Sequence, residues 1–303
     1  MSYLFYGWQE AGLLPVDPMY EKAGTLCEFY DLLSGIWCSD TCAPRLRDEW
    51  SEENKTLGQC SITAFLVQDI YGGEVYGILR PGGNYHCYNV IEGHTVDLTS
   101  EQFGDEASSL CYEGNPVQLR SVHFAKKEKR IRYERLRSDV QEALGVWPRM
   151  RRFNQKISYD KCYEILEHAP RGVLSLHGVN GYPHSVPMDH YFDQINGKLY
   201  FHCAKEGLKI DLISKDNKAS YVVMDEGFRK DGDWALNINS VICCGKIRFI
   251  KEFEEMADIL RKFGNKYYPS PEEVEEEIRK AGARVMLLEL TVDRMTGKLV
   301  NES

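Results

Sequence analysis

The chain has 303 residues, of which 43% are hydrophobic, and its formal net charge is −9. This length is sufficient for two domain cores, and the negative charge argues against a nucleic-acid-binding surface. No segment is apolar for long enough to be a signal peptide core or a membrane span. We therefore expect a two-domain cytoplasmic protein without a membrane partner, with reduced cysteines and no metal site.

The first chemical signature in chain order is a helix start at Cys60. Apolar residues at positions 61–71 lie on one helical face, and Gly72-Gly73 ends the helix. A thiol at a helix N-terminus has a lowered pKa, which a nucleophilic cysteine requires. The adjacent Gln59 could supply an oxyanion donor.

A hairpin is predicted next, with strands at residues 85–91 and 94–99 joined by Glu92-Gly93. A two-residue loop would place His86 diagonally opposite Asp97 on one face, whereas a three-residue loop would separate them. With the two-residue loop, Cys60, His86 and Asp97 would form an activated thiol with an oriented base. The alternative is a packing cysteine, a hydrogen-bonded histidine and a turn-capping aspartate.

Residues 50–103 resemble the YunG-like family. Its pattern includes, after the Gly-Gln-Cys helix start, Gln68-Asp69, Gly72-Gly73, a histidine strand ending near Asn89, Asp97-Leu98-Thr99 and Gln102-Phe103. The order of cysteine, histidine and aspartate is similar to papain-like or transglutaminase-like peptidases, which implies an α+β domain. Gln59 departs from the papain-like pattern, because it is adjacent to Cys60 and not a turn earlier.

We place the N-terminal domain at residues 1–137, a linker at 138–149 and the C-terminal domain at 150–303. The last strand-like segment of the first domain is expected at 117–124. The basic run at 126–132 is predicted to be a solvated linker face, and a short helix at 138–144 ends at Gly145.

The second domain alternates strands with helices at its ends, and two Asn-Gly pairs mark hairpin turns. Strands are predicted at residues 172–179, 182–193, 198–203, 219–224, 239–250 and 284–292, and helices at 158–169, 251–268 and 271–281. This pattern is consistent with closure into a small barrel.

The segment 200–213 carries the strongest ligand-binding signal. An aromatic strand delivers His202, Gly207 lets the backbone approach a ligand, and Lys209 follows at a helix N-terminus. Backbone amides and the helix dipole at such a position favour an anion, so we predict a phosphate site. The alternative is an ordinary strand with a packed histidine and solvated lysines.

Four segments in order, at residues 150–152, 181–188, 200–213 and 240–246, resemble the nitroimidazole-resistance proteins. These form a branch of the flavin-binding split-barrel superfamily, which also contains the pyridoxamine-phosphate oxidases. The resemblance implies a split β-barrel with flanking helices and FMN at a homodimer interface. The arginine-rich substrate motif of the pyridoxamine-phosphate oxidases is absent, so their particular activity is not implied.

The same resemblance assigns roles to individual residues. Pro187, Met188 and Asp189 would border the flavin ring, Lys209 with the backbone of Lys205 to Gly207 would hold the phosphate, His202 would face flavin or substrate, and Ser240 and Val241 would form a further flavin-side strand, in the same or the second subunit. His202 could donate a proton, since imidazole titrates near neutrality, or simply stack.

The predicted function is that of an FMN-binding oxidoreductase fused to a thiol-hydrolase domain. It would transfer electrons from NADH or NADPH to a small-molecule acceptor such as a nitro-aromatic compound. One alternative makes Cys60 the centre of an amidase, peptidase or acyl transferase, with the barrel as a flavin-binding sensor or dimerisation module. Another is a non-catalytic flavin-binding or haem-binding protein.

Overall fold

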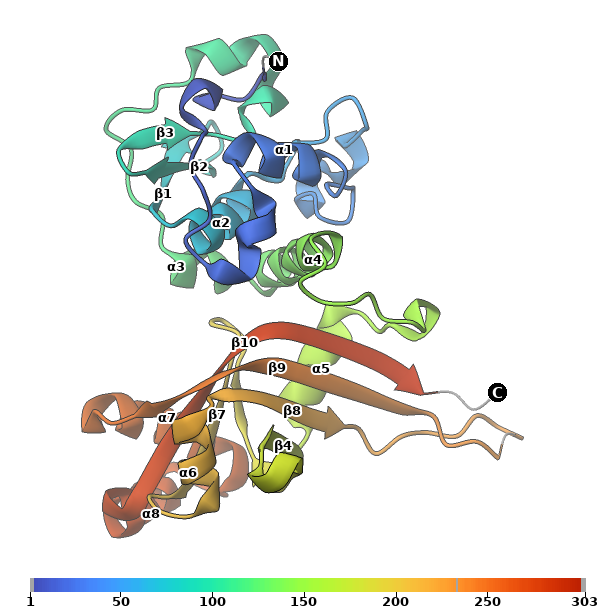
Figure 1. Cartoon of the computed structure of the whole chain (residues 1–303), viewed down its shortest axis with the longest axis vertical. Coiled ribbons are helices and arrows are strands. Elements are labelled where there is room, and N and C mark those ends of the chain that lie inside the picture. Colours follow the sequence, from blue (N-terminus) through green and yellow to red (C-terminus); the bar gives the residue numbers. More distant parts are fainter. Residues whose placement is uncertain (1–2, 233, 301–303) are drawn as a thin grey trace. The chain divides into compact units, whose positions relative to one another are not determined.

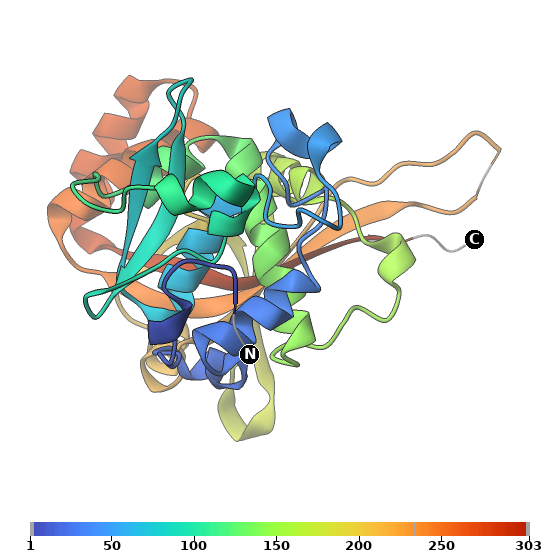
Figure 2. The same cartoon turned by 90° about the horizontal axis from the view of Figure 1, so that it is seen from above.

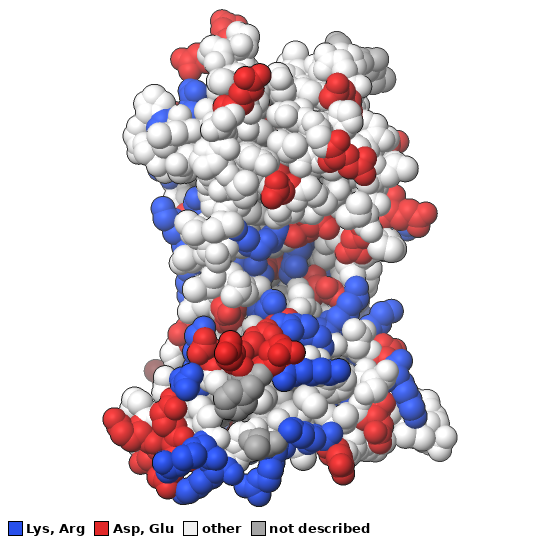
Figure 3. All heavy atoms as spheres, turned by 90° about the vertical axis from the view of Figure 1, so that its left-hand side faces the viewer, with Lys and Arg blue, Asp and Glu red and all other residues white. Residues whose placement is uncertain are grey.

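The computed structural model describes residues 3–232 and 234–300, and it divides into two compact units, Met1–Arg149 and Met150–Ser303. Both units mix helices and strands, as the α+β prediction requires (Figure 1). Among the described residues, no helix is both long and apolar enough to cross a membrane. On the face shown in Figure 3, basic and acidic side chains lie among one another.

The first unit surrounds the helix α2 with a small sheet and further helices. Its helices are α1 (Leu26–Ser34), α2 (Cys60–Tyr71), α3 (Arg120–Phe124) and α4 (Lys127–Ala143), with 3-10 turns η1 (Trp8–Glu10), η2 (Pro18–Ala23), η3 (Pro44–Glu49) and η4 (Ser100–Ser109). The strands β1 (Glu74–Leu79), β2 (Tyr85–Ile91) and β3 (His94–Val96) form an antiparallel sheet in the order β1-β2-β3. Nine of the twelve residues of α2 are buried, so this helix is the centre of the core.

The hairpin between β2 and β3 has the predicted two-residue loop. Ile91 pairs with His94, and both Glu92 and Gly93 have positive φ angles, of 52° and 86°. Positive φ at both central positions matches the right-handed twist of the flanking strands. The strand pairing therefore has the register predicted for a two-residue loop, and Asp97 follows the last paired residue of β3.

The end of the first unit differs from the prediction. The segment expected to be strand-like contains the helix α3, and the basic run begins α4, which continues through residue 143 into the expected linker. Residues 126–128 are exposed, but Arg130 and Arg132 are only 3% and 4% exposed, so the prediction of a solvated linker face is wrong for these two arginines. These charges are buried because each has partners: Arg130 pairs with Glu134, and Arg132 donates to backbone carbonyls.

The second unit is built on one seven-stranded antiparallel sheet. Its strands are β4 (Arg171–His177), β5 (Pro183–Asp189), β6 (Tyr191–Asp193), β7 (Lys198–Ala204), β8 (Lys218–Met224), β9 (Ile238–Ile250) and β10 (Val285–Val300), in the order β5-β4-β8-β9-β10-β7-β6. Strands β5 and β7 come into contact although four strands separate them in this order, so the sheet curls into a barrel. The predicted split-barrel fold is confirmed for this unit.

Helices cover the ends of the curled sheet. They are α5 (Tyr159–His168), α6 (Leu208–Lys215), α7 (Phe253–Tyr267) and α8 (Pro271–Ala281), with 3-10 turns η5 (Phe153–Gln155), η6 (Val179–Gly181) and η7 (Gly282–Arg284). The Ser158 hydroxyl accepts from the Lys161 amide at 3.2 Å, which confirms the predicted N-cap of α5. Figures 1 and 2 both show the segment between β8 and β9 projecting from the sheet.

Strand β10 is longer than predicted, because it continues to Val300 past a register shift between Val292 and Arg294. The neighbouring strand β9 carries Gly245, where an added Cβ atom would lie 2.0 Å from the Thr291 carbonyl oxygen. Only glycine allows this close approach, which lets the two long strands bend together.

Candidate functional site

The first candidate site is the Cys60 thiol at the start of α2. This helix packs on β2, which carries His86, so the imidazole lies beside the thiol and acts on its pKa. The backbone amide of Cys87 on the same strand also acts to lower the pKa of the thiol. The structure thus brings the predicted nucleophile and base together from two elements.

Asp97 completes this arrangement, directly after β3. His86 Nε2 lies 2.5 Å from Asp97 Oδ2, and both side chains are almost fully buried. The carboxylate also accepts from the Tyr112 hydroxyl at 2.9 Å, the Thr99 amide at 3.0 Å and the Thr99 hydroxyl at 3.1 Å. Four donors therefore fix the orientation of Asp97, and Asp97 fixes the ring of His86.

The electrostatics favour an ion pair between the thiol and the imidazole. Burial acts to lower the pKa of His86, but the charge and hydrogen bond of Asp97, together with Cys60, raise that pKa to about 10. Burial acts to raise the pKa of Cys60, but the hydrogen bond and charge of His86 outweigh it and lower that pKa. A lowered thiol pKa is what covalent catalysis by cysteine requires.

The side-chain amide of Gln59, the predicted oxyanion donor, already donates a hydrogen bond within the protein. Its side chain is fully buried, and its Nε2 atom donates to the Cys38 carbonyl oxygen at 3.1 Å. Gln102 contacts the predicted base: its Nε2 atom is 3.4 Å from His86 Nδ1, and its Oε1 atom accepts from the Gly58 amide at 3.3 Å. Sequence reasoning gave Gln102 no role beyond its place in the YunG-like pattern.

Two other contributors had weak or no sequence signals. Thr99 follows Asp97 by two residues, a spacing typical of side-chain turn hydrogen bonds, and could have been found. Tyr112 lies outside any motif, in the segment after η4, and stacks on Tyr6 with a centroid distance of 4.0 Å. Only the tertiary structure shows that it reaches Asp97.

The second candidate site is the turn between β7 and α6. Helix α6 begins directly after Gly207, as predicted, and Gly207 has φ 127° and ψ 165°, a conformation that favours glycine. The position where its Cβ would project is open. Lys205 and Gly207 are exposed, and the half-buried Lys209 places its Nζ atom 3.2 Å from Met188 Sδ.

Strand β5 provides the residues on the other side of Lys209. Pro187 is exposed, Met188 is buried and Asp189 is half-buried, as alternation along a strand requires. Asp189 accepts from Arg171 Nε at 2.5 Å and lines a pocket that His202 also lines. Four of the predicted flavin-site residues, Met188, Asp189, His202 and Lys209, therefore lie in one region.

Ser240 and Val241 lie elsewhere on the sheet. Val241 is fully buried in the core and Ser240 is half-buried, so only Ser240 presents its side chain outward. On β9, the strand that carries both residues, Ile242 lies in one cross-strand row with Val222, Val173 and Pro187. Three strand spacings along the sheet amount to about 14 Å. The Val241 side chain is thus not available to a ligand outside the barrel, and the role of Ser240 stays a prediction.

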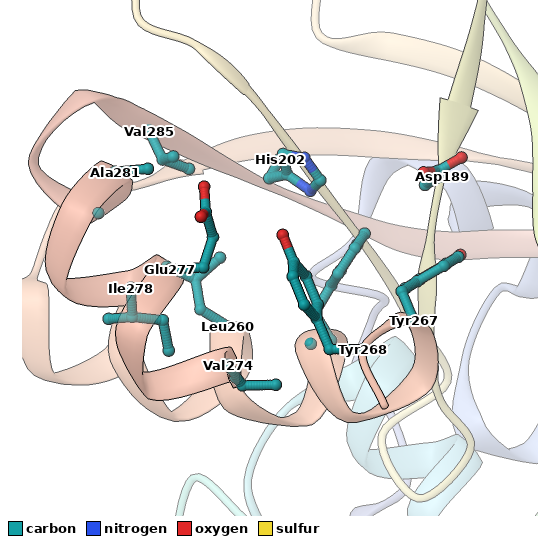
Figure 4. A pocket seen from close by; sticks show the side chains of 13 residues that line it. Asp189, His202, Leu260, Tyr267, Tyr268, Val274, Glu277, Ile278, Ala281 and Val285 are labelled. Carbon is teal, nitrogen blue, oxygen red and sulfur yellow. The ribbon is translucent and has the colours of Figure 1, made fainter. Parts of the chain in front are cut away.

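A pocket of about 360 Å³ opens beside His202, between the α7–α8 hairpin and strands β5 and β7 (Figure 4). It is lined by Asp189, His202, Leu260, Phe263, Gly264, Tyr267, Tyr268, Val274, Glu277, Ile278, Ala281, Gly282 and Val285. The His202 ring packs edge-on against Phe263, with a centroid distance of 4.8 Å. The size of the pocket and its largely apolar walls are typical of small-molecule sites.

The curled antiparallel sheet with helices at its ends defines the second unit as a split-barrel domain. Residues 158–299 match the family described as pyridoxamine 5'-phosphate oxidase, and residues 25–145 match the family described as YunG protein. The chain thus combines a YunG region with a pyridoxamine 5'-phosphate oxidase-like domain, and both predicted resemblances are confirmed.

Individual proteins show similarity to one half or the other. The uncharacterized protein YunG of Bacillus subtilis (strain 168) is 44% identical over 55 residues, which cover 18% of this chain and 47% of that protein. The match therefore spans about half the length of this curated relative. The YunG name carries no activity that could be transferred.

Two solved structures illustrate the similarity of the second half. A protein of Bacteroides thetaiotaomicron named for 5-nitroimidazole antibiotic resistance is 24% identical, with a TM-score of 0.40, over 48% of this chain and 86% of that chain. A FAD-binding protein of Mesorhizobium loti is 17% identical, with a TM-score of 0.36, over 48% and 98% of the two chains. With such low scores, the fold assignment depends on the sheet topology and the family match.

Proposed function

We propose that the C-terminal unit binds FMN and acts as an oxidoreductase that passes electrons from NADH or NADPH to a small-molecule acceptor. The observation that carries this proposal is the position of Gly207 and Lys209 at the start of α6, beside Met188 and His202. This region lies inside the segment that matches the pyridoxamine 5'-phosphate oxidase family.

The residues present fit a phosphate group. The first amides of α6 have no intrahelical acceptor because a helix starts with unpaired N–H groups. They follow a glycine whose side-chain position is open, and the only contact of the Lys209 ammonium group that the structure gives is the weak acceptor Met188 Sδ. Unpaired amides next to a lysine ammonium group are what a phosphate needs.

The remaining residues would position the ring system and the acceptor. Exposed Pro187 and the edge of Met188 offer an apolar border, and His202 would lie at the boundary between the flavin and the pocket. The bound flavin would supply the electron-transfer chemistry itself. Because the strand of Ser240 lies three strand spacings from Pro187 along the sheet, we propose that Ser240 contacts the flavin of a second copy in a homodimer.

The absorbance spectrum of the purified protein tests this proposal. We expect a yellow protein with a flavin spectrum, or a colourless protein that becomes yellow on addition of FMN and separation from free ligand. Anaerobic bleaching by NADH or NADPH would then distinguish a reductase from a passive binder. A protein that neither contains nor takes up FMN would exclude the proposed function.

The first unit supports a second candidate function, that of a cysteine hydrolase or acyl transferase. The observation that favours it is the position of Cys60 beside His86, which is paired with the buried Asp97. Rapid alkylation of Cys60 by iodoacetamide near pH 7, measured by mass spectrometry, would support it. The exposed Cys111 is an internal reference thiol, and equal rates at the two residues would contradict an activated Cys60.

A further inference from the structure

The pocket beside His202 has an aromatic wall and a carboxylate that no described residue neutralises. Phe263 stacks on Tyr267 with a centroid distance of 5.1 Å and meets His202 edge-on, so the three rings form a continuous row. Figure 4 shows Tyr268, directly after α7, and Glu277, on α8, extending into the same space. Such a combination can recognise a flat ring that carries a positive charge.

Two charged groups near the pocket, Asp189 and Lys266, have other partners, whereas Glu277 lines the pocket without one among the described residues. Asp189 at the other end of the pocket is paired with Arg171 at 2.5 Å. The Lys266 ammonium group donates to the carbonyl oxygens of Ala169 at 2.8 Å and His190 at 3.2 Å.

Two basic side chains of the α7–α8 hairpin are paired elsewhere too, and the exposed Lys262 and Arg279 do not line the pocket. Arg261 binds Glu275 at 2.6 Å, and Lys280 binds Glu276. Over residues 3–232 and 234–300, no ion pair involves Glu277.

The apolar part of the pocket limits the size and shape of a ligand. Leu260, Val274, Ile278 and Val285 form its aliphatic surface. A volume of about 360 Å³ accommodates one or two fused rings and excludes a dinucleotide. The carboxylate of Glu277 would repel an anionic ligand in this pocket.

We propose that this pocket binds a small aromatic cation, such as an aromatic amidine or amine, with Glu277 as the counter-ion and the Phe263 and Tyr267 rings as its wall. Phosphorylated aromatic compounds are excluded by the same charge. The proposal concerns binding and holds whether or not a flavin occupies the Lys209 site. If the proposed reductase function is correct, the aromatic cation is the class of acceptor that reaches His202.

Three compounds of nearly identical shape test the role of charge. Isothermal calorimetry on the full chain, with and without added FMN, would compare the cation p-aminobenzamidine, the neutral p-aminobenzamide and the anion p-aminobenzoate. We expect the cation to bind most tightly and the anion not to bind. Glu277→Gln should weaken cation binding about fivefold, the effect expected for a partly exposed ion pair, and should leave the neutral compound unchanged.

Glu272→Gln is the matched control, because Glu272 is exposed on the same helix but does not line the pocket. This variant should bind all three compounds like the unchanged protein. Equal affinities for cation and anion, unchanged cation binding by Glu277→Gln, or no binding of any of the three would overturn the proposal. Each of these results leaves FMN uptake to be judged separately by absorbance, so failure of one proposal is distinguishable from failure of the other.

Discussion

His86 and Asp97 form a buried pair in which the imidazole Nε2 atom lies 2.5 Å from the carboxylate Oδ2 atom. The other ring nitrogen, Nδ1, faces Gln102 and the side of the ring where Cys60 lies. A carboxylate in this position orients the ring and stabilises its protonated form. The reactivity of Cys60 should therefore depend on Asp97, although the two residues lie on different elements.

Asp97→Asn should reduce the reactivity of Cys60. Removal of the charge lowers the pKa of His86, which in turn raises the pKa of Cys60, since the imidazolium no longer stabilises the thiolate. Each unit of increase lowers the thiolate fraction about tenfold at a pH below the thiol pKa. The iodoacetamide rate at Cys60 near pH 6 should fall by at least about tenfold. Asp105→Asn, at an exposed position of η4, is the control and should change nothing.

The buried His190 should make the second unit sensitive to acid. Its Nε2 atom lies 2.6 Å from the Leu166 carbonyl oxygen and its Nδ1 atom 2.8 Å from the Tyr221 hydroxyl, which also donates to the Met188 carbonyl oxygen at 2.8 Å. Burial, together with the charge of Lys266, lowers the pKa of His190 to about 4.

Because the folded pKa lies below the ordinary value of 6.5, the unfolded chain binds more protons between these two values. The free energy of unfolding should therefore fall as the pH decreases from 6.5 to 4, by up to about 3 kcal/mol from this group. Urea denaturation at several pH values would measure the slope. His190→Gln should flatten it, and an unchanged slope would show that other groups cause the acid sensitivity.

Arg132 should stabilise the loop that precedes Cys60. Its guanidinium group donates to the carbonyl oxygens of Thr41 and Gly58, both at 3.2 Å. Arg132→Met removes the partner of two buried carbonyls and should lower the free energy of unfolding by about 3 kcal/mol. Lys126→Ala, an exposed position beside the same helix, should cost far less in urea denaturation. Equal losses would mean that the buried contacts of Arg132 contribute little.

Lys209 should contribute to FMN affinity through the phosphate group. Lys209→Ala should raise the dissociation constant for FMN about tenfold, because a charge-assisted hydrogen bond is lost. Fluorescence quenching of added FMN would measure the effect. Lys215→Ala removes an exposed charge from the other end of α6 and is the matched control. If both variants bind FMN equally well, the phosphate lies elsewhere.

Much of the second unit was predictable because its signals are local. The helix predicted at 271–281 is found as α8 with the same bounds, and the predicted cap at Ser158 makes its hydrogen bond. The strand predicted at 284–292 continues as β10 to residue 300, since its pairing with β9 outweighs the weaker pattern of the last eight residues.

The candidate thiol site was predictable in its main residues for a similar reason. A glycine-flanked helix start places Cys60, and a two-residue turn sets the register that relates His86 to Asp97. The Tyr112 and Gln102 contacts could not be predicted, because they depend on the path of η4 and the segment after it. The basic run in α4 was misjudged, since burial of Arg132 depends on carbonyl groups that are distant in sequence.

The sequence by itself determined most elements of the second unit, the hairpin turn of the first, the glycine before α6 and the residue types of both candidate sites, because periodicity, caps and turns depend on neighbouring residues. The tertiary structure decided which side chains meet. It placed Lys209 next to Met188, buried Val241, and formed the Glu277 pocket from α7, α8 and the strands β5, β7 and β10. These relationships depend on the curl of the sheet and on packing between segments that are far apart in the chain.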